Sequence, residues 1–598
     1  MWPTVSDRAL YLRAAQELRR NPGQWDAYNS TGHCVVLAGP GSGKTKTLTI
    51  KLARLLAEDV EAPRGVACIT YNNECARELE QRLEVLGIEP GGRVFIGTVH
   101  SFSLTQIVMP YAKSAGLGLP DDFRVATQRE RQLALGRAYD RVIGGPENPQ
   151  NWDFRMGNYR RTILNRDSDQ WRIQDPQLAL LVAAYEEELR KQGVIDFDDM
   201  PLLAVKALKE HQWVQRAILA KYPVLVVDEY QDLGRALHLM VMGLCFSTGI
   251  RMFAVGDVDQ SIYGFTGAYP DALQRLSERN DVETVRLRFN YRCGSRIVIA
   301  SQYALGEDRD YQAPDEAAEG TIFFHPGGAY EQQADYLFST VVPNALARMP
   351  DLTLGNIAVL YTAAWIGDAV ANSANRYDFG TIRTDGNALY PRSSRLMRWF
   401  ELCAIWCCHG WQSGIPRFSK IVGEGNRIFA ETLTSDEQRL SFQRELLEIL
   451  WNRRDSTMGL NAWLQQIYDG LVARLIAQSR TLDEEAATLN TFIQRTAEGA
   501  VAGGMTLGQF SGYGEGNDRI NLSTLHSAKG REFALVVLFG MDIGRIPRND
   551  ATHREQREAR RLFYVGFTRA KSELHIMFTA SRPSPFVLEV QRRIETGV

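Results

Sequence analysis

The sequence lacks any apolar segment long enough to cross a membrane, because polar residues interrupt each hydrophobic run before it reaches about 18 residues. The amino terminus also lacks a signal-like apolar core, so we expect a cytoplasmic protein with no membrane partner. Neither sign of charge is in large excess, since 68 basic and 71 acidic residues leave a net charge of −3. A nucleic-acid-binding surface on this chain must therefore be local.

Cysteine is scarce, with 8 residues in 598, and its spacing does not indicate a disulfide framework. We therefore expect free thiols in a reducing compartment. The cluster of Cys403, Cys407, Cys408 and His409 leaves metal ligation open. No second group of ligands accompanies it, however, and Cys403 and Cys407 share one face of an apolar helix, so packing in a core is favoured.

A glycine-rich segment at 38–45 is the organising feature of the chain. It follows an apolar run at 35–37 and precedes a helix-compatible stretch. This order suits a phosphate cradle, because glycines let backbone N–H groups converge on an anion at the start of a helix. A chance glycine turn is the alternative. The loop comprises Ala38, where the usual pattern has glycine, then Gly39, Pro40, Gly41, Ser42, Gly43, Lys44 and Thr45. It predicts a nucleoside triphosphate site in which Lys44 reaches the β- and γ-phosphates and the Thr45 hydroxyl ligates Mg²⁺.

Two acids at the end of an apolar run form the second decisive element. The run at 224–227 suits a central strand of a parallel sheet, and ligands bind beyond the carboxyl ends of such strands. We expect Asp228 to hold Mg²⁺ and Glu229 to orient the attacking water or accept its proton. A simple turn is the alternative.

Two further segments join strand patterns to polar or aromatic residues. Residues 94–102 predict a strand that ends in polar residues, and 252–257 predict another. The loop that follows combines Gln260 with Tyr263 and Phe265, which suits a γ-phosphate sensor joined to a base-stacking surface. By composition alone, aromatic residues of this kind are more often part of a core.

The motifs in this order resemble those of the UvrD/Rep family of superfamily 1A DNA helicases. Each segment alone is a weak sign, whereas the ordered set is very specific. The matching segments are Gln24, 38–45, 69–79, 97–102, 195–200, 227–232, 255–268, 287–292, 522–533 and 560–570.

The resemblance implies an α/β fold with two RecA-like parallel-sheet domains, each carrying a mainly helical inserted subdomain, and ATP bound between the domains. The first domain would comprise 1–103 and 196–285, interrupted by the insertion 104–195. The second would comprise 286–385 and 511–598, interrupted by the insertion 386–510. The glycine-rich segment 503–516 is expected to be a hinge.

The resemblance also implies roles for individual residues. In the nucleotide site these are Gln24 at the base edge, Tyr291 stacked on adenine, Gln260 as γ-phosphate sensor, Arg292 and Arg569 as arginine fingers, and Glu532 at the ribose. The implied DNA contacts are Tyr71, Thr98, His100, Tyr263, Phe265, Thr524 and His526.

Some positions depart from the family pattern. Phe265-Thr266 stands where the family usually has Trp-Arg, which removes a cation and reduces one stacking platform. Glu74 and Thr362 replace a common lysine and a common arginine, and the second insertion is shorter than in better-known members. These changes leave the ATPase centre whole and weaken the case for strong duplex unwinding.

We therefore expect ATP-driven translocation along single-stranded DNA, with Mg²⁺ as cofactor and with the 3′ to 5′ polarity that the family implies. DNA junctions are expected as further substrates, in repair, replication or defence. The alternative is a DNA-gated ATPase subunit that regulates a partner nuclease. A third option is a P-loop ATPase that acts on no nucleic acid.

Overall fold

The computed structural model describes residues 5–88, 92–264, 267–479, 481–500, 502–513 and 518–597. The chain divides into two compact units, one formed by Met1–Glu319 with Thr552–Tyr564 and the other by Gly320–Ala551 with Val565–Val598. Each unit contains a six-stranded sheet in which all described pairings are parallel. The predicted α/β class with two parallel sheets is therefore confirmed.

The first sheet has the strand order β3-β2-β6-β7-β1-β8. The run at 224–227 is β6, which lies inside the sheet between β2 and β7, as an uninterrupted apolar strand should. The strands are β1 (His33–Ala38), β2 (Val66–Thr70), β3 (Val94–Thr98), β6 (Val224–Val227), β7 (Arg251–Gly256) and β8 (Val282–Leu287).

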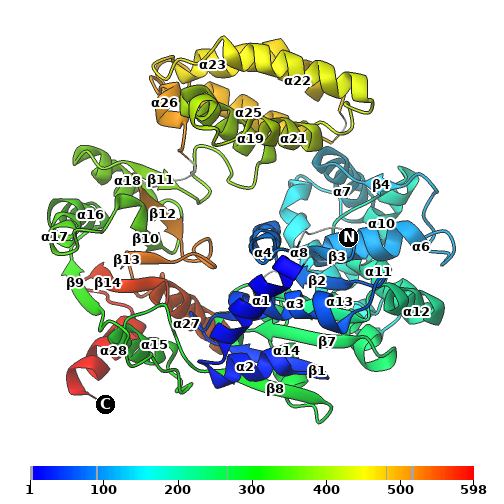
Figure 1. Ribbon diagram of the computed structural model, residues 1–598, viewed down its shortest axis with the longest axis horizontal. Coiled ribbons are helices and arrows are strands. Elements are labelled where there is room, and N and C mark those ends of the chain that lie inside the picture. Colours follow the sequence, from blue (N-terminus) through cyan, green and yellow to red (C-terminus); the bar gives the residue numbers. More distant parts are fainter. Residues whose placement is uncertain are drawn as a thin grey trace. The chain divides into compact units, whose positions relative to one another are not determined.

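Helices cover both faces of this sheet. Successive strand residues point to opposite faces, so each strand contributes to two apolar cores. Val35 and Val227 belong to one apolar core, whereas Val36 and Val226 belong to the other. The helices of this unit outside its insertion are α1 (Val5–Leu18), α2 (Pro22–Asn29), α3 (Lys44–Arg54), α4 (Asn73–Val85), α5 (Val99–Phe102), α11 (Asp199–Glu210), α12 (Gln212–Lys221), α13 (Arg235–Val241), α14 (Asp271–Ser277) and α15 (Ser295–Leu305) (Figure 1).

The first insertion is mainly helical, as predicted, and has its own core around Leu135, Leu181 and Tyr185. A short parallel pair of strands, β4 (Arg124–Val125) and β5 (Val194–Ile195), connects the start of the insertion to its return. Its helices are α6 (Met109–Tyr111), α7 (Gln128–Val142), α8 (Asp153–Thr162), α9 (Asp169–Ile173) and α10 (Pro176–Lys191).

The second sheet has the order β11-β12-β10-β13-β14-β9, with buried β10 near its centre. Its strands are β9 (Thr321–Gly327), β10 (Ile357–Tyr361), β11 (Thr381–Arg383), β12 (Ile520–Thr524), β13 (Phe533–Leu538) and β14 (Ala570–Thr579). The accompanying helices are α16 (Tyr330–Tyr336), α17 (Val342–Arg348), α18 (Ile366–Arg376) and α28 (Pro585–Thr596). Most of α27 (His553–Phe567) lies in the segment Thr552–Tyr564, which groups with the first unit.

The second insertion is a helical bundle with an aromatic core. Cys403 and Cys407 lie in that core with free thiols, and Cys408 is half-buried. Within the described residues, no group of three or more His, Cys, Asp or Glu side chains has the arrangement of a metal site. The helices are α19 (Arg395–Ile405), α20 (Trp411–Ser413), α21 (Phe418–Ile428), α22 (Asp436–Trp451), α23 (Leu460–Ile467), α24 (Ala473–Ala477), α25 (Asp483–Arg495) and α26 (Leu507–Phe510).

The division between the units differs from the boundary expected at 285/286, because residues 286–319 group with the first unit. Strand β8 pairs with β1 along its whole length, and just beyond it the Tyr291 N–H donates to the Gly41 carbonyl at 2.8 Å. The expected hinge at 503–516 contains α26, and its residues 514–516 lie outside the described part. Among the described residues, no helix combines the length and apolar character needed to span a membrane.

Candidate functional site

The polar residues predicted to form the nucleotide site converge at the carboxyl edge of the first sheet. Parallel strands deliver their following loops to the same edge, which is where such sheets bind ligands. The glycine loop follows β1, Asp228 and Glu229 follow β6, and Gln260 lies just beyond β7. The edge strand β8 leads to Tyr291 and Arg292, so this unit alone gathers most of the predicted site.

The glycine loop adopts a conformation that only glycine accepts readily. Gly41 and Gly43 have φ of +67° and +80°. A Cβ on Gly43 would lie 2.5 Å from Gln24 Nε2, so the close approach of Gln24 also requires glycine. Gly43 caps α3 without a side-chain hydrogen bond, so the amino end of the helix is presented to an anion.

Lys44 lies among acids at the centre of the site. Its Nζ is 3.9 Å from Glu229 Oε1 and 4.0 Å from Asp257 Oδ2. Burial raises the pKa of Asp228 to about 7, with a further contribution from the Glu229 carboxylate, and burial raises the pKa of Asp257 to about 6. A buried group of carboxyls with raised pKa values is stabilised by added positive charge.

Hydrogen bonds orient the acids and the predicted sensor. Glu229 has φ of 49°, a left-handed conformation that is costly for a non-glycine residue, and its Oε2 accepts from Gln231 Nε2 at 2.5 Å. Gln260 donates its amide to Asp257 Oδ2 at 2.5 Å. Asp257 therefore contacts both the predicted sensor, Gln260, and Lys44.

The predicted adenine side is assembled around Gln24 and Tyr291. Gln24 donates to the Ser42 carbonyl at 2.8 Å, and Asn21 Nδ2 donates to the Tyr291 hydroxyl at 2.9 Å. Tyr291 is half exposed. The amide of Asn290 fixes the next turn, since its Oδ1 accepts from the Arg292 N–H at 2.9 Å.

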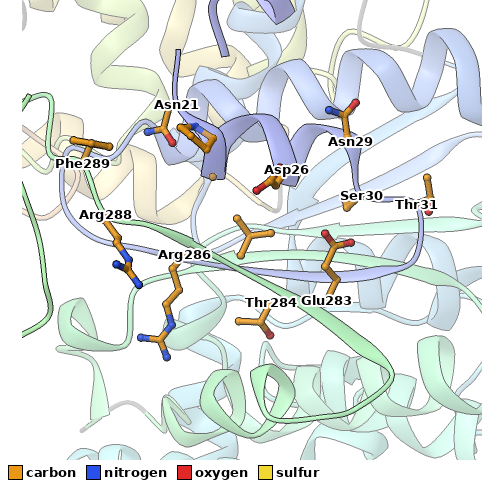
Figure 2. Close-up of a pocket in the computed structure, with 13 residues that line it drawn as sticks. Asn21, Asp26, Asn29, Ser30, Thr31, Glu283, Thr284, Arg286, Arg288 and Phe289 are labelled. Carbon is orange, nitrogen blue, oxygen red and sulfur yellow. The ribbon is translucent and has the colours of Figure 1, made fainter. Parts of the chain in front are cut away.

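A polar groove of about 670 Å³ continues from Asn21 between α2 and β8. Figure 2 shows Asp26 on the helix side and Glu283, Thr284 and Arg286 on the strand side. The groove approaches the site from the side of Gln24 and Tyr291, which is the side where a nucleobase is expected.

The structure brings together some of the predicted DNA contacts of the first unit. Tyr71 and Tyr263 stack on each other, with ring centroids 4.9 Å apart and planes at 22°. Thr98 ends β3 and accepts from the Ser101 N–H, and the His100 ring meets Phe197 edge-on at 6.0 Å. Burial lowers the pKa of His100. Phe265 and Thr266 lie outside the described residues, as does the side chain of Glu74.

The second unit holds the remaining predicted residues. Thr524 ends β12 and exchanges hydrogen bonds with Ser527, and burial lowers the pKa of His526 nearby in the chain. Glu532 pairs with Lys571 at 2.6 Å. Arg569 is buried and donates to two carbonyl oxygens within its own unit, that of Val565 at 2.9 Å and that of Arg531 at 3.3 Å.

The sequence analysis did not identify two acids, Asp257 and Asp259, that the structure places at or next to this site. Asp257 approaches Lys44, and its place at the end of β7 is a signal comparable to that of Asp228. Buried Asp259 takes two hydrogen bonds from Arg309, at 2.8 and 2.9 Å. No sequence pattern relates these two residues, because only the fold brings them together.

Comparisons with known proteins find two matching family models and several related proteins. Residues 20–281 match the model of the UvrD/REP helicase N-terminal domain, and residues 437–581 match that of the UvrD-like helicase C-terminal domain. The ATP-dependent DNA helicase Rep of Salmonella typhimurium is 26% identical, over 96% of this chain and 94% of its own length. The ATP-dependent DNA helicase PcrA of Bacillus subtilis is 26% identical, over 93% of this chain and 82% of its own.

DNA helicase II of Escherichia coli is 25% identical, over 92% of this chain and 82% of its own length. The similarity to each relative thus spans both units and both insertions. The phosphate loop, the acids beyond β6 and the sensor beyond β7 lie within the first matched domain, and the motifs that carry Thr524 and Arg569 lie within the second. The chain belongs to the UvrD/Rep family of superfamily 1A helicases.

Proposed function

We propose that this protein is an ATP-dependent DNA helicase that moves along single-stranded DNA, with 3′ to 5′ polarity. The observation that carries the proposal is the cluster of Lys44, Glu229 and Asp257 at the carboxyl edge of the first sheet. The relatives reported above are named ATP-dependent DNA helicases, and DNA-dependent ATP hydrolysis is the activity that this cluster fits.

The residues present fit a magnesium nucleotide. The positive φ angles of Gly41 and Gly43 open the cradle for phosphate, and the raised pKa of buried Asp228 favours a cation beside it. Thr45 and Asp228 would hold Mg²⁺, which when bound neutralises charge on the phosphate oxygens. These two oxygen ligands are of the kind that Mg²⁺ prefers.

The protein side chains then divide the work of hydrolysis. Lys44 stabilises charge on the β- and γ-phosphates, and Glu229 takes a proton from the attacking water. Gln260 senses the γ-phosphate through a side chain that Asp257 already orients. The remaining proposed roles are Gln24 at the base edge, Tyr291 on adenine, Glu532 at the ribose, and Arg292 and Arg569 on the transferred phosphate.

The proposed DNA contacts supply stacking faces and polar groups that tolerate any base sequence. Tyr71 and Tyr263 form a prearranged aromatic pair. The other contacts are Thr98, His100, Phe265, Thr524 and His526. Junctions and a pathway in repair, replication or defence belong to the same proposal.

The test uses the purified protein alone. We expect single-stranded DNA to stimulate ATP hydrolysis, and we expect displacement of a strand from a duplex with a 3′ single-stranded tail but not from one with a 5′ tail. The Glu229→Gln variant should still bind ATP and should lose both activities, because the amide keeps the shape of the carboxyl and lacks its basicity.

Each result bears on one part of the proposal. Stimulation without strand displacement would favour a DNA-gated ATPase that serves a partner such as a nuclease. Hydrolysis that DNA fails to stimulate would overturn the nucleic-acid function altogether. Normal turnover by Glu229→Gln would remove Glu229 from its proposed role.

A further inference from the structure

Three neighbouring strands of the second sheet send their carboxyl-terminal loops to one edge. They are β12, β10 and β13, and the proposed DNA contacts Thr524 and His526 follow the first of them. Trp365 follows β10, the adjacent strand, and Arg545 follows β13 on its other side. The edge that carries the proposed DNA contacts of this unit therefore also carries an indole and a guanidinium.

Trp365 and Arg545 are in direct contact and accessible. The Trp365 side chain is 48% exposed, which is unusual for so large an apolar group, and the Arg545 guanidinium lies 4.8 Å from the centre of its ring. Tyr330 closes the inner side, with its ring centroid 5.9 Å from that of Trp365. Arg545 is also an exposed residue, so both partners can meet a ligand.

Buried Asp542 holds the loop that carries Arg545. One carboxylate oxygen accepts from the Thr579 N–H at 2.7 Å, and the other accepts from the Thr579 hydroxyl at 2.9 Å and the Tyr330 hydroxyl at 3.2 Å. The Asp542 carbonyl in turn accepts from the Arg545 N–H at 3.1 Å. Arg545 is thus presented by a fixed loop, which lowers the entropy cost of binding.

We propose that Trp365 and Arg545 form a base-stacking site for single-stranded DNA on the second unit, which rests on the proposed helicase function. An exposed indole offers a face to any base, and the adjacent guanidinium attracts the phosphate backbone. The other proposed contacts in this unit, Thr524 and His526, offer no comparable aromatic surface. Trp365 and Arg545 also supply the residue types that the sequence lacks at Phe265-Thr266.

The test compares Trp365→Ala with Trp365→Phe, using an oligothymidine of about 20 nucleotides as the probe. We expect Trp365→Ala to raise the DNA concentration for half-maximal ATPase stimulation about fivefold to 150-fold, with unstimulated and DNA-saturated rates within about twofold. Trp365→Phe should retain most of the affinity because it keeps an aromatic face. With an abasic oligonucleotide the difference between wild type and Trp365→Ala should disappear, since no base is there to stack.

Trp451→Ala is the matched control. Trp451 is 49% exposed and lies under Arg454, with the guanidinium 3.4 Å from its ring, but it belongs to α22 of the insertion. The Trp451→Ala substitution should leave the affinity for oligothymidine unchanged. An equal loss of affinity in Trp451→Ala and Trp365→Ala would overturn the proposed site. So would unchanged affinity in Trp365→Ala, or a loss that persists with abasic DNA. A wild-type protein that oligothymidine neither binds nor stimulates would instead overturn the proposed function, and this site with it.

Discussion

Lys44 and Lys46 stand two positions apart on α3 and have opposite surroundings. Lys44 is half-buried among the acids of the site, whereas Lys46 pairs with Glu17 at 2.6 Å on the surface. The proposed function uses only the first ammonium group. An exposed pair such as the second contributes at most about 1 kcal/mol to stability.

We predict that Lys44→Ala abolishes ATP turnover, because it removes the cation that neutralises the β- and γ-phosphates. Lys46→Ala, on the same helix, should leave turnover near that of the wild type. DNA-stimulated phosphate release from the two purified variants is the measurement. Comparable losses in both would indicate that α3 as a whole had been disturbed and would remove the specific role of Lys44.

For individual residues, the sequence predicts which side chains belong to the site better than it predicts which side chains contact one another. The glycine loop, the acids at 228–229 and Gln260 are recognisable because each lies next to a strand pattern. The hydrogen bond from Asn21 to Tyr291 and the ion pair of Arg309 with Asp259 cannot be recognised in the sequence, because the two residues of each contact are far apart in the chain. The approach of Arg569 to the Arg531 carbonyl belongs to the same class.

Among the elements, α8 of the first insertion is anchored by a buried arginine. The Arg160 side chain is 1% exposed and meets Asp196 at 2.6 Å, Asp199 at 2.8 Å and Glu186 at 3.0 Å. Asp196 and Asp199 lie where the insertion returns to α11, within the segment 195–200 that matches the family motif. These ion pairs therefore connect α8 of the insertion to the start of α11, which packs on the first sheet.

We predict that Arg160→Ala destabilises the first unit by about 3–5 kcal/mol, since it leaves the buried carboxylate of Asp196 without the guanidinium that it pairs with. Arg155→Ala is the control on the same helix, because Arg155 pairs with Asp175 at the surface, at 3.5 Å, and should cost about 1 kcal/mol or less. Urea unfolding followed by pulse proteolysis reports which part of the chain opens. Equal midpoints for the two variants would contradict the anchoring role.

Predictions of elements succeed where the apolar pattern is strong. The strands predicted at 224–227 and 252–257 are found within one residue of their expected ends. The strand expected over 94–102 is half wrong, because Thr98 caps a helix that begins at Val99. The short β11 and the edge strand β9 were not predicted. Neither strand is buried along its whole length, so neither has the continuous apolar run by which a strand is recognised in a sequence.

For the whole molecule, the resemblance predicted the two parallel sheets and the two helical insertions. Sequence could not predict that residues 286–319 group with the first unit. That grouping depends on the pairing of β8 with β1 and on contacts such as that of Tyr291 with Gly41, which have no local signature. As a consequence Arg292 and Arg569, the two proposed arginine fingers, belong to different units.

We predict that replacing either arginine by alanine lowers DNA-stimulated turnover at least tenfold while affinity for an ATP analogue changes much less. A guanidinium on the transferred phosphate contributes roughly 10³–10⁵ in rate, whereas a surface ion pair contributes about 1 kcal/mol at most. For Arg569 the alternative is a purely structural role, because its guanidinium donates to the Arg531 carbonyl. The carboxylate of Glu573, four positions along the chain, pairs with Arg348 and His575. A melting curve separates the two: Arg569→Ala with a lowered melting temperature and a loss of turnover below about tenfold would assign Arg569 to the structure and not to hydrolysis.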